Sequence, residues 1–172
     1  MLRILLIPFL IPILGSSQQK EPDSSSINEI VRKIDKLSEA NNRIFVNDKL
    51  INNKKVEERW QHFDNKKLSR IAIDYIIDSA AYSERYNSTA YSEKYYFKEG
   101  SLIYAYESIV FFLPDLGIDQ GAVWAGDFYF AKGKLIDHVT LGHGKSESDD
   151  WDPEKEILER LEKRKKELRS LK

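Results

Sequence analysis

Apolar residues follow a helical period near both ends of the chain, and they alternate with polar residues in between. This pattern predicts a helix over residues 27–41, a sheet of β-hairpins over 43–141 and a second helix over 152–172. A polar tether, residues 18–26, precedes the first helix. An acidic linker, residues 142–151, connects the sheet to the second helix. Residues 27–172 are therefore expected to form a single α+β domain.

The first helix carries one apolar stripe and a start signal. Ser26 is followed three residues later by Glu29, the spacing of a capping box that satisfies backbone N–H groups of the first turn. The pair Asn41-Asn42 marks the expected end. The stripe consists of Ile27, Ile30, Val31, Ile34 and Leu37.

The second helix is expected to start at Asp152 as the N-cap, with Pro153 in the first helical position. Its apolar stripe lapses between Glu162 and Glu167, and the basic stretch 163–166 within that interval is balanced by glutamates. We therefore expect the first turns to dock on the sheet and the later turns to be solvated.

A nine-residue pattern occurs three times, at residues 60–68, 94–102 and 127–135. Each copy is predicted to be a strand, a tight turn and a second strand. Gly100 and Gly133 suit the positive φ of such turns, whereas Lys66 stands at the equivalent position of the first copy. A shorter copy at 45–51 extends the series, which predicts an antiparallel sheet of six to eight strands packed with both helices.

Two-residue turns would fix the register of these hairpins. They place three equivalent cross-strand pairs on one face, and that face is expected to carry the helices. A type I turn with a bulge would shift a hairpin by one residue, and the sequence leaves this alternative open. The three pairs are Phe63 with Leu68, Phe97 with Leu102, and Phe130 with Leu135.

The order of helix and tandem hairpins, with the signature aromatic-aromatic-Phe-x-x-Gly-Lys-Leu, resembles a group of small exported bacterial proteins of unknown function. The resemblance covers roughly residues 27–141. The hairpins are also loosely similar to MORN-type antitoxin repeats. Neither resemblance implies a catalytic residue.

Residues 1–17 have the pattern of a secretory signal peptide. Arg3 precedes the apolar run from Ile4 to Leu14, and Gly15 and Ser17 provide small residues for cleavage before Gln18. Eleven residues at about 1.5 Å each are too short to cross a ~30 Å hydrocarbon core. We expect an exported protein, periplasmic or secreted after cleavage, with membrane contact only through this segment. An uncleaved anchor is the alternative.

Charge and composition narrow the classes of function. The chain has 27 Lys and Arg against 28 Asp and Glu, a balance that gives no reason to expect nucleic-acid binding. It contains no cysteine, which excludes disulfides, a cysteine nucleophile and thiolate metal ligands. The sequence has no phosphate-binding glycine loop and no nucleophile elbow. A non-enzymatic role without a cofactor is therefore favoured.

One catalytic alternative is a metal-dependent hydrolase. In the register of two-residue turns Asp127 lies opposite His138, and a carboxylate beside an imidazole favours acid–base or metal chemistry. His143 and the acidic residues that follow it extend this candidate site. The simpler interpretation is a solvated Asp–His contact followed by a solvated linker.

Aromatic residues provide the candidate binding surface. The segment Ala-Tyr-Ser-Glu-x-Tyr occurs twice, and an apolar loop follows the second hairpin. Such residues favour a protein or glycan partner in the cell envelope, although tyrosines could instead cover the sheet edge and the loop could fold over the core. A structural or assembly module of the envelope is a further alternative, and the oligomeric state is left open. The candidate binding residues are Tyr82, Tyr86, Tyr91, Tyr95, Phe111, Phe112 and Leu113.

Overall fold

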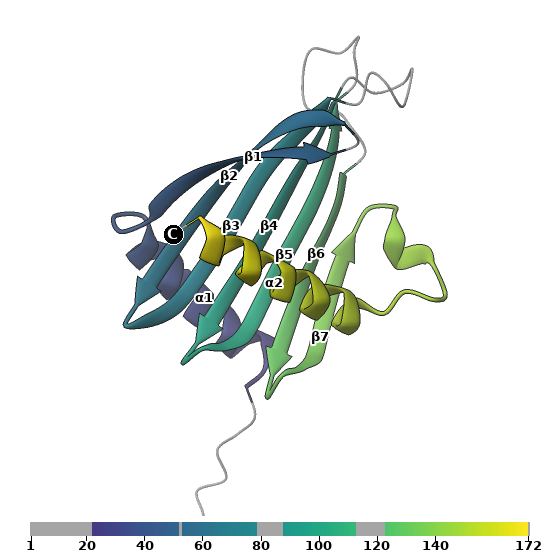
Figure 1. The fold of residues 1–172 in the computed structure, drawn as a ribbon. Coiled ribbons are helices and arrows are strands. Elements are labelled where there is room, and N and C mark those ends of the chain that lie inside the picture. The colour runs from purple at the N-terminus through teal and green to yellow at the C-terminus, as the bar shows by residue number, and fades with distance from the viewer. Residues whose placement is uncertain (1–21, 52, 79–87, 113–122, 172) are drawn as a thin grey trace, which may run out of the picture.

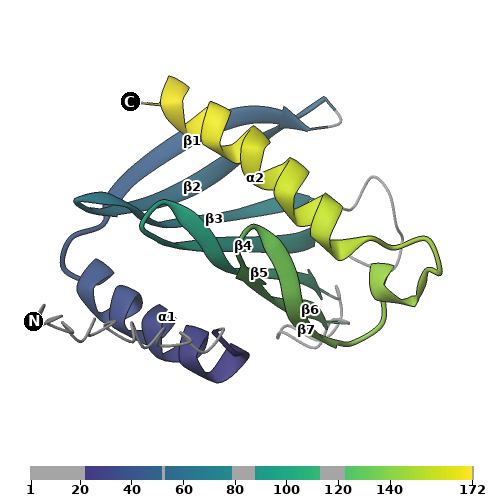
Figure 2. The same ribbon diagram turned by 90° about the horizontal axis from the view of Figure 1, so that it is seen from below.

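The computed structural model describes residues 22–51, 53–78, 88–112 and 123–171. They form one seven-stranded antiparallel sheet with a helix on each face, an α+β fold that confirms the predicted class (Figure 1, Figure 2). The strands are β1 (Arg43–Ile51), β2 (Lys54–Asn65), β3 (Lys67–Asp78), β4 (Ser88–Lys98), β5 (Ser101–Phe112), β6 (Val123–Ala131) and β7 (Lys134–Leu141). The helices are α1 (Ser24–Ser38), the short 3-10 helix η1 (Lys145–Glu147) and α2 (Pro153–Ser170).

The strands follow one another in chain order across the sheet, so each pairs with its sequence neighbour. β1 and β7 are the two edges. This meander needs no long crossover, in agreement with the hairpins predicted from the sequence.

The second and third copies of the nine-residue pattern have the predicted turns. Phe97 pairs with Leu102 and Phe130 with Leu135, around two-residue turns in which both residues have positive φ. Beyond each pair the register shifts by one bulge residue. That shift moves every later partner away from the position expected for an unbroken ladder.

The first copy differs, and the predicted pair of Phe63 with Leu68 is wrong. Leu68 lies opposite Asp64, and Phe63 lies opposite Arg70 beyond a further bulge. Lys66 has φ 62° in a turn one residue shorter than its two counterparts. The slip reverses side-chain faces because strand side chains alternate, so Phe63 points to the α1 side of the sheet.

The two helices cover opposite faces, so the expectation that one face carries both is wrong (Figure 2). Successive aromatic residues on one strand explain the result, since Tyr95 is buried toward α2 and its neighbour Tyr96 toward α1. The core under α2 includes Trp60, Ile71, Ile73, Tyr95, Phe128, Phe130, Ile157, Leu161 and Leu168. The core under α1 consists of Ile27, Ile34, Phe63, Tyr96, Tyr104 and Tyr129.

Helix α1 begins at Ser24, before the predicted residue 27, because Asp23 is its N-cap. The Asp23 carboxylate accepts a hydrogen bond from the Ser26 backbone N–H at 2.9 Å, and the Ser26 hydroxyl oxygen accepts one from the Asp23 N–H at 3.1 Å. Ser26 is thus the distal partner of the capping box rather than its start.

Helix α2 begins as predicted, with Asp152 as the N-cap and Pro153 in the first turn. The expectation that its later turns are solvated is wrong, since Leu168 is buried and Arg164 is only 5% exposed. Arg164 replaces the missing apolar contacts with ion pairs to the sheet, which are described next.

Candidate functional site

Three glutamates lie inside the sheet face that α2 covers. Glu58 on β2, Glu93 on β4 and Glu107 on β5 are 0%, 5% and 3% exposed. Strand alternation places Glu58 on the same face as Trp60, and Glu93 on the same face as Tyr95. Buried carboxylates are costly unless cations and hydrogen-bond donors reach them.

Arg164 of α2 supplies the cation for two of these glutamates. Its Nη2 and Nε lie 2.6 and 3.0 Å from the two carboxylate oxygens of Glu93, and its Nη1 lies 3.0 Å from Glu58 Oε1. Nη1 also donates to Glu167 at 2.8 Å. Burial alone would lower the pKa of Arg164, but its hydrogen bonds to Glu93 and Glu167 and the charge of Glu58 raise it above its ordinary value.

Glu107 forms the second half of the network. Lys145 Nζ lies 2.6 Å from both Glu107 Oε2 and Glu156 Oε1, and Arg160 donates to the same two carboxylates. Burial tends to raise the pKa of Glu156, but hydrogen bonds from Lys145 and Trp151 lower it overall. The network therefore ties β5, the linker and the first half of α2 together.

A crevice of about 320 Å³ opens beside this network, between α2 and strands β3 to β5. Tyr75 and Tyr91 line it as a stacked pair, with ring centroids 4.9 Å apart and planes 8° from parallel. We call this hollow the α2 crevice. Its charged lining consists of Glu93, Glu107, Lys145, Glu156 and Arg160.

A second hollow of about 430 Å³ lies toward β1 and β2 and shares Tyr75, Glu93 and Arg160 with the α2 crevice. Lys49 and Arg164 belong to its lining. The shared residues make the two hollows neighbours along the same charged face of α2.

Burial and the nearby charge of Glu93 raise the pKa of Tyr75 from 10.0 to about 12. The folded protein therefore keeps the Tyr75 proton at a pH where the unfolded chain has lost it. The contribution of this proton to stability is complete below pH 10 and is lost as the pH rises through about 12. Urea unfolding across this range should show a smaller loss of stability for Tyr75→Phe than for the wild type. Equal losses in the two proteins would contradict the assignment.

The arrangement favours binding over acid–base catalysis. Arg and Lys side chains occupy oxygens of Glu58, Glu93 and Glu107, so the three carboxylates are committed to structural ion pairs. What remains for a ligand is a rigid wall of oriented donors and acceptors next to the Tyr91 ring, since Tyr75 has Tyr91 stacked on it and the Arg164 guanidinium 5.8 Å from its ring centroid.

The structure does not bring the predicted acid–base residues together. Asp127 pairs with Val139, and His138 pairs with Phe128, because the bulge between Tyr129 and Phe130 shifts the ladder. The prediction that Asp127 faces His138 is therefore wrong, and the two side chains lie on opposite faces.

Each of these residues has another partner. Asp127 accepts a short hydrogen bond from the Tyr104 hydroxyl on the α1 side, and burial with this bond raises the pKa of Tyr104 above its ordinary value. The His138 ring stacks on Phe128 at 6.4 Å and meets Trp151 edge-on at 5.7 Å. Both residues therefore support packing in the described structure.

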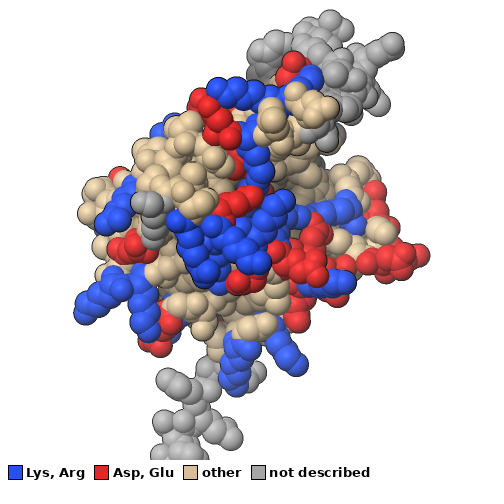
Figure 3. All heavy atoms as spheres, in the orientation of Figure 1, with Lys and Arg blue, Asp and Glu red and all other residues tan. Residues whose placement is uncertain are grey.

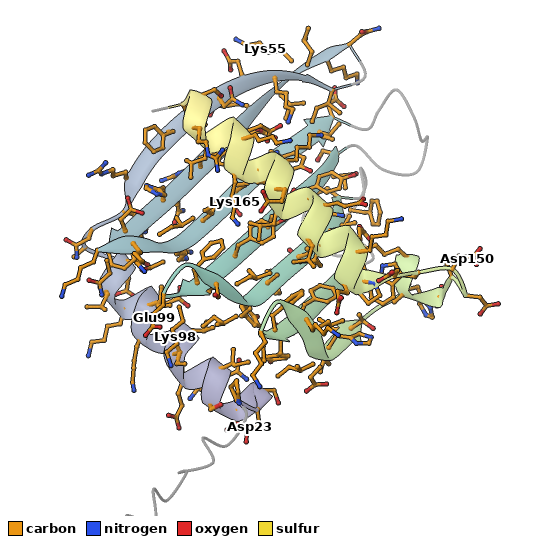
Figure 4. All side chains as sticks on the ribbon, turned by 60° about the horizontal axis from the view of Figure 1, so that its bottom comes forward. Asp23, Lys55, Lys98, Glu99, Asp150 and Lys165 are labelled. Carbon is orange, nitrogen blue, oxygen red and sulfur yellow. The ribbon has the colours of Figure 1, made fainter. Side chains whose placement is uncertain are left out.

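His143 lies on the exposed loop after β7, where its side chain is 94% exposed. A hydrogen bond from its Nδ1 to Glu147 at 2.5 Å raises the pKa of His143. Figure 4 shows Asp150 of the acidic linker pointing outward from the same loop. Among the residues that the structure describes, no three His, Asp or Glu side chains gather as a metal site.

The predicted aromatic binding residues separate into four groups. Tyr91 lines the α2 crevice, whereas Tyr95 is fully buried and donates its hydroxyl to Glu93 at 3.0 Å, so Tyr95 is not available to a ligand. Phe111 and Phe112 are half-buried at the end of β5. Tyr82, Tyr86 and Leu113 lie outside the described residues.

The sequence interpretation missed the central residues of the site. Tyr75, Glu93 and Arg164 were not candidates, yet Glu93 stands two residues before Tyr95 and so shares its face. Charged residues at inward positions of adjacent strands were the available signal.

No family model matches the chain, and no curated protein or solved structure matches it. Over the described ranges, no helix combines the length and apolar character needed to cross a membrane.

Proposed function

We propose that the protein is an exported, non-catalytic binding protein of the cell envelope and that its ligand is a glycan held in the α2 crevice. The observation that carries the proposal is the stacked pair Tyr75 and Tyr91 beside Glu93, Glu107 and Arg160. Sugar rings present an apolar face to aromatic side chains and hydroxyl groups to charged hydrogen-bonding partners. The crevice offers both surfaces side by side.

Its size and charge favour a particular kind of ligand. A volume of about 320 Å³ is near the lower end of the range for small-molecule sites, which favours a sugar unit over a folded protein partner. Carboxylates and cations alternate along the lining, so a neutral or zwitterionic sugar fits better than a strongly charged one. Export is supported by the N-terminal pattern of Arg3, an apolar run and small residues.

The metal-dependent hydrolase alternative gains no support from the geometry. Asp127 and His138 occupy opposite faces of β6 and β7, and His143 lies on an exposed loop. A binding role does not require Asp127, His138 and His143 to lie together, because other residues form the lining of the α2 crevice.

The proposal predicts that Tyr91→Leu weakens glycan binding about tenfold or more, because a stacking surface is lost. A glycan array probed with the mature protein identifies the sugar, and calorimetric titration then measures its affinity. Tyr106→Leu is the matched control, since Tyr106 is a half-buried tyrosine whose partners Lys94 and Asp127 place it on the opposite face. An array without a positive glycan, or equal affinity in Tyr91→Leu and wild type, would overturn the proposal.

A further inference from the structure

A larger hollow of about 520 Å³ lies at the other end of α2, against the turn between β2 and β3. Four of its lining residues are cationic, namely Lys66, Lys67, Lys165 and Arg169. His62, Asp64, Leu68 and Leu168 complete the lining. We call it the basic hollow. Figure 3 shows Lys and Arg gathered over the middle of α2 and Asp and Glu toward its N-terminal end.

The positive charges of the basic hollow are only partly neutralised. Its acidic residue, Asp64, lies with Oδ1 3.0 Å from Nε2 of the buried His62. Lys165 Nζ lies 3.0 Å from Glu162 Oε1 and also over the Phe97 ring at 5.5 Å. Within the part of the chain that the structure describes, Lys66, Lys67 and Arg169 form no ion pair. A hollow lined by an excess of one charge concentrates counter-ions of the opposite sign.

The helix dipole explains only one member of this cluster. Arg169 lies in the last turn of α2, where a cation compensates the negative end of the helix, whereas Lys165 lies one turn earlier. Lys66 and Lys67 belong to a hairpin turn about a hundred residues earlier in the chain, where no helix end favours them. Their position against α2 brings two independent pairs of cations to one hollow.

The backbone of Lys66 has φ 62°, in the left-handed region. Glu99 and Lys132 adopt the same conformation in the other two turns, with φ 56° and 53°. The conformation is therefore a property of these hairpin turns, and the case for the basic hollow depends on its charge and shape.

We propose that the basic hollow is a binding site for the phosphate group of an anionic ligand. Arg169 offers a planar pair of donors, and the lysines supply point charges around the same space. Leu68 and Leu168 provide an apolar wall for the part of the ligand that carries the phosphate. A soluble phosphate ester and the headgroup of an anionic phospholipid share this chemistry. The site is separate from the α2 crevice and does not depend on glycan binding.

The test measures the binding of inorganic pyrophosphate to the mature protein by calorimetric titration at low ionic strength. The double variant Lys67→Gln/Arg169→Gln is expected to bind pyrophosphate about tenfold or more weakly than wild type, because two charge-assisted contacts are removed. The control is Lys98→Gln/Lys166→Gln, which removes two exposed cations from a neighbouring hairpin and the same helix but not from the lining. It should bind within about twofold of wild type.

A second arm distinguishes the two sources of phosphate. The amount of protein that sediments with vesicles of phosphatidylglycerol, compared with vesicles of phosphatidylcholine, measures binding to the anionic headgroup. The same two double variants are tested in this assay. Binding of either pyrophosphate or phosphatidylglycerol vesicles that is lost in Lys67→Gln/Arg169→Gln and kept in the control supports the site. Binding of neither probe, or equal weakening by the control variant, overturns the proposal.

Discussion

Arg164→Met is expected to lower the free energy of unfolding by about 3–5 kcal/mol, the cost of removing one partner from a buried ion pair. Arg164 is the only cation within hydrogen-bonding distance of Glu93 in the described structure, and its loss leaves that carboxylate with the Tyr95 hydroxyl alone. Glu58 is less affected, because Lys49 Nζ lies 3.6 Å away and the Trp60 indole N–H donates to it at 3.1 Å.

Urea unfolding of the variant and the wild type measures this loss. Arg169→Met is the matched control on the same helix, since Arg169 is exposed and its replacement should change stability by less than about 1 kcal/mol. Adding Glu93→Gln to Arg164→Met should restore part of the stability, because a neutral amide is cheaper to bury than an unpaired carboxylate. A loss below about 1 kcal/mol for Arg164→Met would show that water or rearranged side chains compensate the glutamates.

This network links the fold to both proposed sites. Arg164 holds the later turns of α2 on the sheet, where an apolar stripe would normally do so. The α2 crevice lies on one side of that contact, and the basic hollow lies toward the C-terminal end of the same helix. The position of α2 therefore determines the width of both hollows, and a variant that loosens Arg164 should weaken both ligands together.

Local chemistry explains which parts of the fold were predictable. Alternation of apolar and polar residues identified the hairpins, and the glycines at 100 and 133 predicted two turns correctly. These signals act over a few residues, so they can be recognised in the sequence without knowledge of the tertiary structure.

The candidate site depended on longer-range facts. A bulge in β7, opposite the step from Tyr129 to Phe130, adds one residue to that strand and so separates Asp127 from His138. The role of Arg164 depends on Glu58 and Glu93, which lie 106 and 71 positions away. In the sequence Arg164 is one of four consecutive basic residues, and nothing local distinguishes the buried one.

Phe63 and Phe130 are equivalent in the repeated pattern but are expected to stabilise different helices. Phe63 packs in the core with Ile27 and Ile34 of α1, whereas Phe130 packs with Ile157 and Leu161 of α2. Each Phe→Ala substitution should cost about 3–5 kcal/mol, since both rings are buried and their removal leaves a cavity.

Hydrogen exchange of backbone amides distinguishes the two effects beyond the shared loss of stability. Phe63→Ala should reduce protection in α1 more than in α2, and Phe130→Ala should do the reverse, because local opening follows the core that each ring fills. The two variants serve as controls for each other, since they make the same chemical change at matched repeat positions. Loss of protection in the same helix for both would mean that the two rings share one face, as two-residue turns throughout would require. Reduced protection of α1 by Phe63→Ala and of α2 by Phe130→Ala would show that the slipped turn of the first hairpin moves Phe63 to the face that Tyr96, Tyr104 and Tyr129 already form under α1.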